Sequence, residues 1–382
     1  MRDLANLSRI LVLLFAGVSS TACQQQMDAA AQHNAVDAGS GTLVSAGPMR
    51  SARAAHTATS LPDGRVLLAG GLTGEEDARH GAEIYDPVSG RFTLAGPMHT
   101  PRHSHTATQL SDGTVLLAGG YDPRGAYLSS AELYNPASGT FVPAGAMQSS
   151  RAGHVAVRLS DGRVLLVGGV GTGWTFLSSA EVYDPATRTF SPTGSLNLPR
   201  ESHVAVRLAD GRVLIVGGHR GRRENIELYT SVEVYEPTTG IFRSAGDMTV
   251  RRHKHDAVLL QDGRVLITGG TDERDDRGRY TSAEIFDPRV GTATRTGTMR
   301  LPRYKHASTS VVLADGRVLI AGGAAEAEVY DPASETFVLV EGEARMVGQF
   351  SATAPLADGR VLVTGGYGEG QGPQTGAWLY SP

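Results

Sequence analysis

Four aromatic residues in this sequence are candidates for binding a sugar ring. They are Trp174, Tyr121, Tyr127 and Tyr280, and each lies in a stretch rich in Gly, Ser or Arg between apolar segments, which is typical of an exposed loop. An exposed aromatic ring can stack on a sugar, whereas packing within its own loop would leave it no role in binding. Arg222, in a basic stretch with two other arginines, is a fifth candidate for ligand binding.

Three ionisable residues could supply acid–base chemistry. Glu201, Asp256 and Tyr304 each stand in a single copy beside a recurring Arg-x-x-His motif. A carboxyl or phenol group acts as a general acid or base only within hydrogen-bonding reach of its substrate. No sequence spacing pairs these three residues. We therefore expect no catalytic residue, and we retain Glu201 and Asp256 as ligand-binding candidates.

Two histidine pairs and one acidic stretch have features of metal ligands. His103 and His105 are two residues apart, as are His253 and His255, so each pair places two imidazoles on one strand face, where they could bind zinc or copper. The two pairs belong to different repeats, however. The acidic stretch 272–276 lacks the D-x-D-x-D-G spacing of a calcium loop. We therefore predict no metal site and no cofactor.

A repeated unit must position these residues. The dipeptide Asp-Gly recurs seven times at intervals of 43 to 53 residues, followed each time by a Val-Leu run and Gly-Gly. In the first copy, short segments at 56–61, 66–69, 82–85 and 92–94 alternate with turn residues, and no helical periodicity appears. Four short strands per copy predict one blade of an all-β propeller.

The two ends of the repeat array complete one another. The last copy stops after its third strand, whereas residues 41–49 match residues 91–98, the fourth strand of the first copy. We expect this N-terminal strand to complete the last blade and close the ring, which would remove two exposed sheet edges. The prediction is therefore a seven-bladed propeller formed by residues 41–382.

The repeat resembles the kelch motif. The form Arg-x-x-His…Asp-Gly-Arg-Val-Leu…Gly-Gly…Glu-x-Tyr-Asp-Pro is similar to the long kelch arrays of secreted bacterial proteins and to the central domain of galactose oxidase. The resemblance implies a kelch-type propeller but leaves function open, because this fold hosts oxidases, sugar mutarotases and pure binding modules. Galactose oxidase chemistry needs a Tyr–Cys crosslink beside copper. The single cysteine, Cys23, lies outside the propeller, so we do not expect that chemistry here.

Three polar positions recur in the first six copies: an Arg, a His three residues later, and a Glu in the third strand. In the seventh copy the matching residues are Gly348, Ser351 and Trp378. Their joint loss in one copy indicates that the three residues form one interaction unit. A buried carboxylate needs a partner, which Arg and His can supply, so we interpret the unit as a structural strut. The alternative is a ring of Arg and His around the channel mouth that holds an anion.

The N-terminal residues predict export. Residues 1–22 combine early arginines with an apolar run of nine residues, which fits a signal peptide and is too short to span a bilayer. Ser20-Thr21-Ala22-Cys23 resembles the bacterial lipobox, which implies lipidation of Cys23; cleavage after Ala22 that leaves a free thiol is the alternative. Residues 23–40 contain few large apolar side chains and predict a flexible tether. We expect an exported lipoprotein at the outer membrane or cell surface.

Composition and loop variation limit the class of partner. The net charge is −4, so no global positive field would attract nucleic acid. The loops between the second and third strands differ most among the copies, and strand alternation places them on the rim where the chain enters each blade. Our hypothesis is a tethered, non-catalytic module that binds a protein or glycan partner at this rim and contacts the membrane only through its lipid. The alternative is a carbohydrate-active enzyme similar to periplasmic kelch mutarotases of sialic acid.

Overall fold

The first blade shows how one repeat becomes a sheet. Its strands pair antiparallel in chain order: β2 (Thr57–Ser60), β3 (Val66–Ala69), β4 (Ala82–Asp86) and β5 (Arg91–Leu94). The hairpin between β2 and β3 turns at Asp63 and Gly64, where Gly64 has a φ of +85° that favours glycine. The Asp63 carboxylate accepts a hydrogen bond from the backbone N–H of Arg65 (3.1 Å), which fixes this turn.

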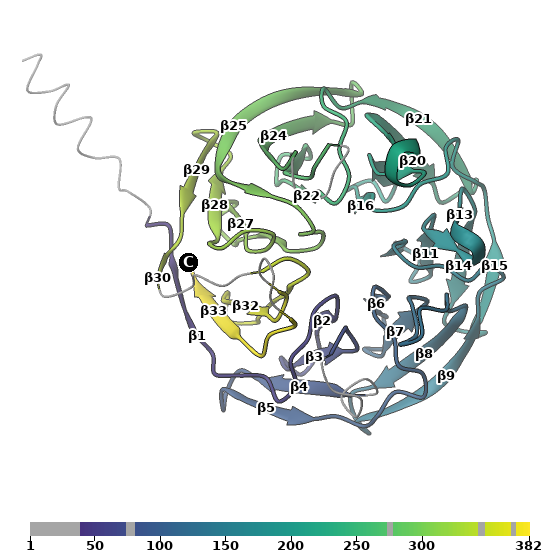
Figure 1. Ribbon diagram of the computed structural model, residues 1–382, viewed down its shortest axis with the longest axis vertical. Coiled ribbons are helices and arrows are strands. Elements are labelled where there is room, and N and C mark those ends of the chain that lie inside the picture. The colour runs from purple at the N-terminus through teal and green to yellow at the C-terminus, as the bar shows by residue number, and fades with distance from the viewer. Residues whose placement is uncertain (1–38, 74–80, 273–277, 343–347, 368–371) are drawn as a thin grey trace, which may run out of the picture. The chain divides into compact units, whose positions relative to one another are not determined.

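The same sheet is built along the rest of the chain. The computed structural model describes residues 39–73, 81–272, 278–342, 348–367 and 372–382. Blades 2, 3 and 4 contain β6 (Thr106–Gln109), β7 (Val115–Ala118), β8 (Ser130–Asn135), β9 (Thr140–Ala146); β10 (Val155–Arg158), β11 (Val164–Val167), β14 (Ala180–Asp184), β15 (Thr189–Pro192); and β16 (Val204–Arg207), β17 (Val213–Val216), β20 (Ser231–Glu236), β21 (Ile241–Asp247). Blades 5, 6 and 7 contain β22 (Asp256–Leu259), β23 (Val265–Thr268), β24 (Tyr280–Asp287), β25 (Thr292–Arg303); β26 (Ser310–Val312), β27 (Val318–Ile320), β28 (Glu328–Asp331), β29 (Thr336–Leu339); and β31 (Ala352–Pro355), β32 (Val361–Thr364), β33 (Ala377–Ser381) with β1 (Thr42–Ser45). Within these described ranges the strands therefore form seven four-stranded groups, arranged as a ring (Figure 1).

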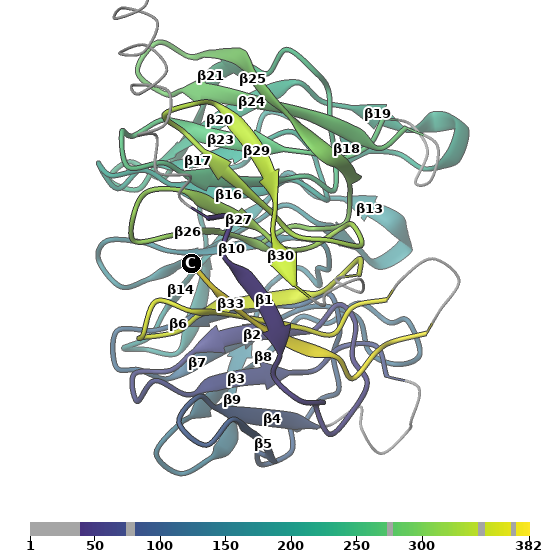
Figure 2. The same ribbon diagram turned by 90° about the vertical axis from the view of Figure 1, so that its left-hand side faces the viewer.

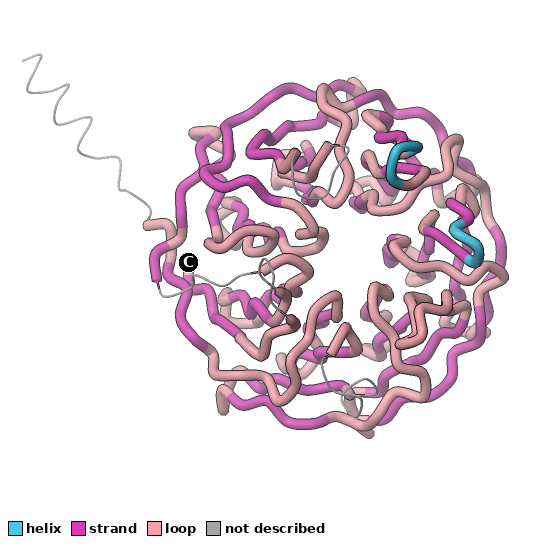
Figure 3. Tube along the Cα trace, viewed as in Figure 1, coloured by secondary structure: helices cyan, strands magenta, loops and turns pink. Residues whose placement is uncertain are grey.

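A few short elements decorate this ring. Two-residue strands form small ribbons in the loops of blades 3 and 4, and one more follows blade 6: β12 (Val170–Gly171), β13 (Thr175–Phe176), β18 (His219–Arg220), β19 (Glu227–Leu228) and β30 (Glu341–Gly342). Two short 3₁₀ turns, η2 (Thr172–Trp174) and η3 (Arg223–Asn225), are the helical elements of the described residues (Figure 3). The fold is thus an all-β propeller, as the repeat predicted.

The N-terminal strand closes the ring. β1 pairs antiparallel with β33, from Thr42 opposite Ser381 to Ser45 opposite Trp378. Its other edge pairs in parallel with β30, so β1 lies between two strands from the C-terminal part of the chain (Figure 2). Both edges of β1 are therefore covered, which removes free sheet edges at this seam.

The hydrophobic core lies between neighbouring blades. Along β3, Val66 and Leu68 pack into a cluster shared with blade 7, whereas Leu67 and Ala69 pack into a cluster shared with blade 2. Successive side chains of a strand point to opposite faces, so both faces of this strand are buried. This explains why the second strand of each copy is an unbroken apolar run, which predicted burial on both faces.

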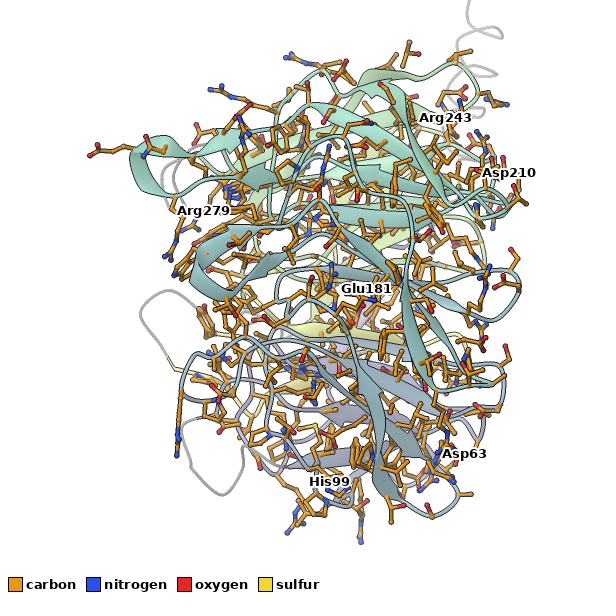
Figure 4. All side chains as sticks on the ribbon, turned by 90° about the vertical axis from the view of Figure 1, so that its right-hand side faces the viewer. Asp63, His99, Glu181, Asp210, Arg243 and Arg279 are labelled. Carbon is orange, nitrogen blue, oxygen red and sulfur yellow. The ribbon has the colours of Figure 1, made fainter. Side chains whose placement is uncertain are left out.

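A buried Arg–Glu pair holds the incoming chain of six blades. The pairs have N–O distances of 2.6 to 3.1 Å: Arg53–Glu83, Arg102–Glu132, Arg151–Glu181, Arg200–Glu233, Arg252–Glu284 and Arg303–Glu328. In blade 3 the Arg151 guanidinium also donates to the Gly168 carbonyl (2.8 Å), and Glu181 accepts the backbone N–H of Gln148 (2.8 Å). The pair thus ties the segment entering the blade to its third strand, in the interior of the propeller (Figure 4). The interpretation of these residues as a strut is confirmed.

Residues 40–382 form one compact unit by their contacts. The predicted signal peptide, Cys23 and the greater part of the predicted tether lie outside the described residues, so they stay predictions. No helix within the described ranges has the length and apolar character needed to cross a membrane.

Candidate functional site

One rim of the propeller gathers the variable loops and the segments that enter each blade. Isolated bridges join them: Ala54 pairs with Leu72, His103 with Tyr121, Ala152 with Val170, and Glu201 with His219. The Asp-Gly turns lie on the other rim, and Figure 4 shows Asp63 and Asp210 on the side opposite Arg279, which follows β23. The expectation that the variable loops share a rim with the entering segments is confirmed.

A closed circle of backbone hydrogen bonds surrounds the channel mouth on this rim. The residue just before each repeat histidine donates its N–H to the carbonyl of the corresponding residue in the preceding blade, over 2.9 to 3.5 Å. The seven members, which we call the mouth ring, are Ala55, Ser104, Gly153, Ser202, Lys254, Lys305 and Phe350. All have φ between +51° and +61°. Sequence reasoning missed this ring, because only Gly153 carries the residue type that usually marks positive φ.

A cavity of about 520 Å³ is lined by all seven members of the mouth ring. Most of its other lining residues are small Ala, Ser and Thr side chains at the start of the innermost strands. Tyr121 and Phe350 add aromatic rings to the wall. Apart from histidines, the ionisable lining residues that carry charge near neutral pH are Glu201, Lys254 and Lys305.

The repeat histidines that reach this cavity are neutral. Burial, and to a lesser degree the adjacent arginine, lowers the pKa of His56 and His203 to about 3. His56 instead connects two blades, since its Nε2 lies 2.9 Å from Thr364 Oγ1 of β32. The repeat arginines are buried against their glutamates, so the recurring Arg and His present no positive ring to the channel.

The structure brings the loop aromatics of blades 2 and 3 together. The Tyr121 and Tyr127 rings are 4.8 Å apart, and the Tyr127 and Trp174 rings meet edge to face at 5.9 Å. Trp174 is 43% exposed and has a φ of +63° in the 3₁₀ turn η2, at the tip of the β12–β13 ribbon. The Arg222 guanidinium, from the loop of blade 4, lies over the Trp174 ring. We call these four residues the aromatic group.

Glu201 lies between the aromatic group and the cavity. It lines the cavity together with Tyr121, and its Oε1 is 3.5 Å from His219 Nε2. Burial raises the pKa of Tyr121, and the negative charge of Glu201 raises it further. The His219 ring in turn meets the His253 ring edge to face at 4.6 Å. Sequence reasoning named Glu201 but missed the contact with His219, because these side chains come from an entering segment and from a later loop.

Two of the candidate residues lie apart from this group. Tyr280 begins β24, and its ring lies 5.3 Å from the Arg252 guanidinium of the blade 5 strut. Asp256 is 1% exposed, and its carboxylate accepts backbone N–H groups of four residues at 2.8 to 3.0 Å: Ala257, Ser308, Thr309 and Ser310. Burial raises the pKa of this carboxyl group.

The sequence contains the reason for the Asp256 contacts. From His306 to Asp315 there are nine positions, two more than in the other copies. The extra residues bulge out before β26, and the Asp256 carboxylate satisfies the backbone donors of that bulge. The structure therefore gives Asp256 a structural contact and keeps it out of the cavity lining.

The histidine pairs also have separate neighbours. His103 stacks on Tyr121 at 5.3 Å, whereas His105 Nε2 lies 3.3 Å from Thr57 Oγ1 of the preceding blade. The part of the chain that the structure describes contains no group of three or more His, Cys, Asp or Glu side chains placed to hold a metal ion. Most of the acidic stretch 272–276 lies outside the described residues, as does Cys23.

Comparison with protein-family models finds the kelch motif at residues 102–148, 151–197 and 202–249. This domain is a kelch-repeat propeller. The three matched segments cover blades 2, 3 and 4, which carry the aromatic group. No curated protein matches the chain.

Many solved structures share the kelch propeller fold. A fungal alcohol oxidase of the AA5 family, in complex with copper, aligns with a TM-score of 0.70 and 18% identity, covering 90% of this chain and 76% of that one. The structure of YjhT aligns with a TM-score of 0.61 and 14% identity, covering 77% of this chain and 99% of that one. At such identities the likeness establishes the fold, whereas function has to be argued from the site.

Proposed function

We propose that this kelch propeller is a non-catalytic module that binds a glycan at its variable rim. The observation that carries the proposal is the aromatic group, in which loops of three blades place a half-exposed Trp174 beside Tyr127 and under the Arg222 guanidinium. A flat, exposed aromatic face flanked by hydrogen-bond donors suits a sugar ring, which is apolar on its faces and polar at its edge. A protein partner at this rim is the other outcome that the test must detect.

The surroundings of the two candidate carboxylates favour binding over catalysis. Asp256 is buried and uses its oxygens on backbone N–H groups, so it has little capacity to exchange a proton with a ligand. Glu201 is then the carboxylate left in the cavity lining among the described residues. General acid–base catalysis with two carboxyl groups, as in most glycoside hydrolases, therefore lacks its second group here.

A carbohydrate-active enzyme, such as a sugar mutarotase, is the second candidate. Its support is the proximity of Glu201 Oε1 to His219 Nε2 (3.5 Å) beside Tyr121 at the cavity wall. A carboxylate and an imidazole in contact can exchange a proton with a bound sugar. Mutarotation needs only such proton transfers, without a metal or a redox cofactor.

A glycan array with the full chain tests the proposal, and a mutarotation assay on common sugars tests the alternative. We expect selective glycan binding that Trp174→Ala weakens about tenfold or more, because the stacking surface is lost. Val88→Ala, at a fully solvent-exposed site outside the aromatic group, is the control and should bind as the wild type does. Measurable turnover that Glu201→Gln abolishes would favour the enzyme, and binding to proteins alone would contradict the glycan proposal.

We also propose that the propeller is exported and held at the outer membrane or cell surface by a lipid on Cys23. Its support is the apolar run and the small residues that precede the single cysteine of the chain. Cys23→Ser should move the protein from the membrane fraction to the soluble fraction and prevent labelling by a fatty-acid analogue. A wild-type protein that carries no lipid would contradict this part of the proposal.

A further inference from the structure

The two lysines of the chain occupy neighbouring positions of the mouth ring. Lys254 and Lys305 are the only lysines in the sequence, and the other 33 basic residues are arginines. The Lys305 N–H donates to the Lys254 carbonyl over 2.9 Å, so the two residues are adjacent around the channel. Four of the other five ring positions hold Ala, Ser or Gly, which shows that the ring itself does not require a long side chain.

Several features make this placement unfavourable for the fold alone. Both lysines are half-buried and line the same cavity, so two like charges share a partly desolvated space. Both also have a φ near +54°, printed as 53° and 55°, a region that non-glycine residues adopt at a cost. An unfavourable arrangement that the backbone does not need points to a role in binding.

The wall around the lysines sets where their charge acts. The Lys305 ammonium lies 4.9 Å from the Tyr304 ring and 5.3 Å from the Phe350 ring, which holds it at the cavity wall. The Asp256 carboxylate behind this wall is occupied by backbone N–H groups. Glu201 lies in blade 4, next to Gly153 and His219. The cavity therefore has a cationic side in blades 5 and 6 and an aromatic side that includes Tyr121.

We infer that Lys254 and Lys305 form a subsite for an oxyanion of the ligand, the chemistry that carboxylates and sulfates share. The inference rests on the proposed function: a glycan that stacks on the aromatic group would place its acidic substituent against the two ammonium groups, since Tyr121 and both lysines line one cavity. A lysine ammonium offers three rotatable donors and a compact charge, which suits an oxyanion of variable orientation. The glycan is therefore acidic.

Titration calorimetry with three matched oligosaccharides tests this subsite: a neutral galactan, an oligogalacturonate of the same length, and a sulfated galactan. We expect the full chain to bind at least one acidic probe about tenfold or more tightly than the neutral one, with an affinity that falls as salt rises. The double variant Lys254→Ser, Lys305→Ala carries residue types found elsewhere in the mouth ring. It should lose the preference for acid while keeping the wild-type melting temperature and the affinity for neutral sugar.

The outcomes separate this inference from the proposed function. Equal affinity for neutral and acidic probes, or a preference that survives in the double variant, overturns the subsite while glycan binding stands. If no oligosaccharide binds, the glycan proposal fails. Galacturonate and inorganic sulfate are then tested alone: stabilisation of the wild type that the double variant lacks supports an anion subsite, and its absence overturns the subsite too. A preference for the uronate over the sulfated probe assigns a carboxylate, and the reverse assigns a sulfate.

Discussion

Two positions in each Arg-x-x-His segment follow opposite rules, although they are two residues apart. The first, occupied by Arg151 in blade 3, is buried and donates through its side chain to Glu181 and to the Gly168 carbonyl. The mouth-ring position, occupied by Gly153, is held by backbone hydrogen bonds to its counterparts in the adjacent blades. The first position keeps one residue type in six blades, whereas the second holds Ala, Ser, Gly, Lys or Phe.

This difference teaches where a symmetric repeat can hold an asymmetric site. A side chain that satisfies buried partners has to be the same in every blade, because each blade presents the same partners. A position held by its own backbone can change its side chain without loss of those hydrogen bonds. The mouth ring can therefore carry two lysines in blades 5 and 6 and an aromatic ring in blade 7 while the propeller stays intact.

Removal of the seam should have the largest effect on the symmetric part. Deletion of residues 41–47 removes β1, so that β33 and β30 both lose their partner strand and Leu43 leaves the core between blades 6 and 7. We expect a large fall in melting temperature, or aggregation through the exposed edges. Thermal denaturation and size-exclusion chromatography measure both results.

The matched control for this deletion is its neighbour in sequence. Deletion of residues 24–40 removes a stretch with few large apolar residues, so stability should change by no more than about 0.5 kcal/mol. If both deletions melt at the wild-type temperature, β1 does not hold the ring closed in solution.

Acid should weaken the propeller through its interblade histidines. Burial lowers the pKa of His56, His203 and His306 to about 3, from an ordinary value of 6.5. Between these two pH values the unfolded chain binds protons that the folded chain does not. Stability is therefore complete above pH 6.5 and falls as the pH drops toward 3, by about 1.4 kcal/mol per histidine and pH unit.

Denaturant unfolding between pH 7.5 and 4.5 measures this slope above the range in which carboxylates titrate. His203→Ser, with the residue type of Ser351 in blade 7, should reduce the slope, whereas the exposed His99→Ala should leave it unchanged. A stability that stays constant from pH 7 to pH 5 would show that the histidines do not need to be neutral in the folded state.

The strut should be the next most sensitive feature. Glu181→Ala leaves the Arg151 guanidinium buried without its carboxylate and removes the acceptor for the backbone N–H groups of Gln148 and Ser149. The expected loss is about 2–4 kcal/mol, because Arg151 keeps its bonds to backbone carbonyls. Chemical denaturation measures it, and Glu181→Gln should lose less. Glycan binding by the folded fraction should not change, and a binding loss at wild-type stability would move the strut into the functional site.

The architecture was predictable because the repeat states it seven times. The Asp-Gly turns, the apolar second strands and the Gly-Gly pairs are local signals, and comparison of the copies separates them from chance. The closing role of β1 was predictable for the same reason, since residues 41–49 match the fourth strand of another copy.

The site was predictable only in part, because its contacts join different blades. Loop position and residue type were enough to select Trp174, Tyr121, Tyr127 and Arg222, but not to show that they meet. The role of Asp256 depends on a two-residue insertion in the next blade, a signal that the sequence does contain between His306 and Asp315. The mouth ring is made by backbone groups, which leave no mark in residue types.

Exchange of residues within the mouth ring should have the smallest effect on stability and thus sharpen the comparison. In Ser202→Lys, Lys254→Ser the ring keeps the backbone bond between these residues (3.0 Å), and each new residue type already occurs in the ring. The number of lysines is unchanged, but they are no longer adjacent. We expect the free energy of unfolding to stay within about 0.5 kcal/mol of the wild type, as for substitutions that remove no buried contact. The same exchange should weaken binding of the acidic probe, because the two ammonium groups no longer meet one oxyanion. A large loss of stability would show that the mouth ring depends on its side chains, and the two positions would then follow one rule.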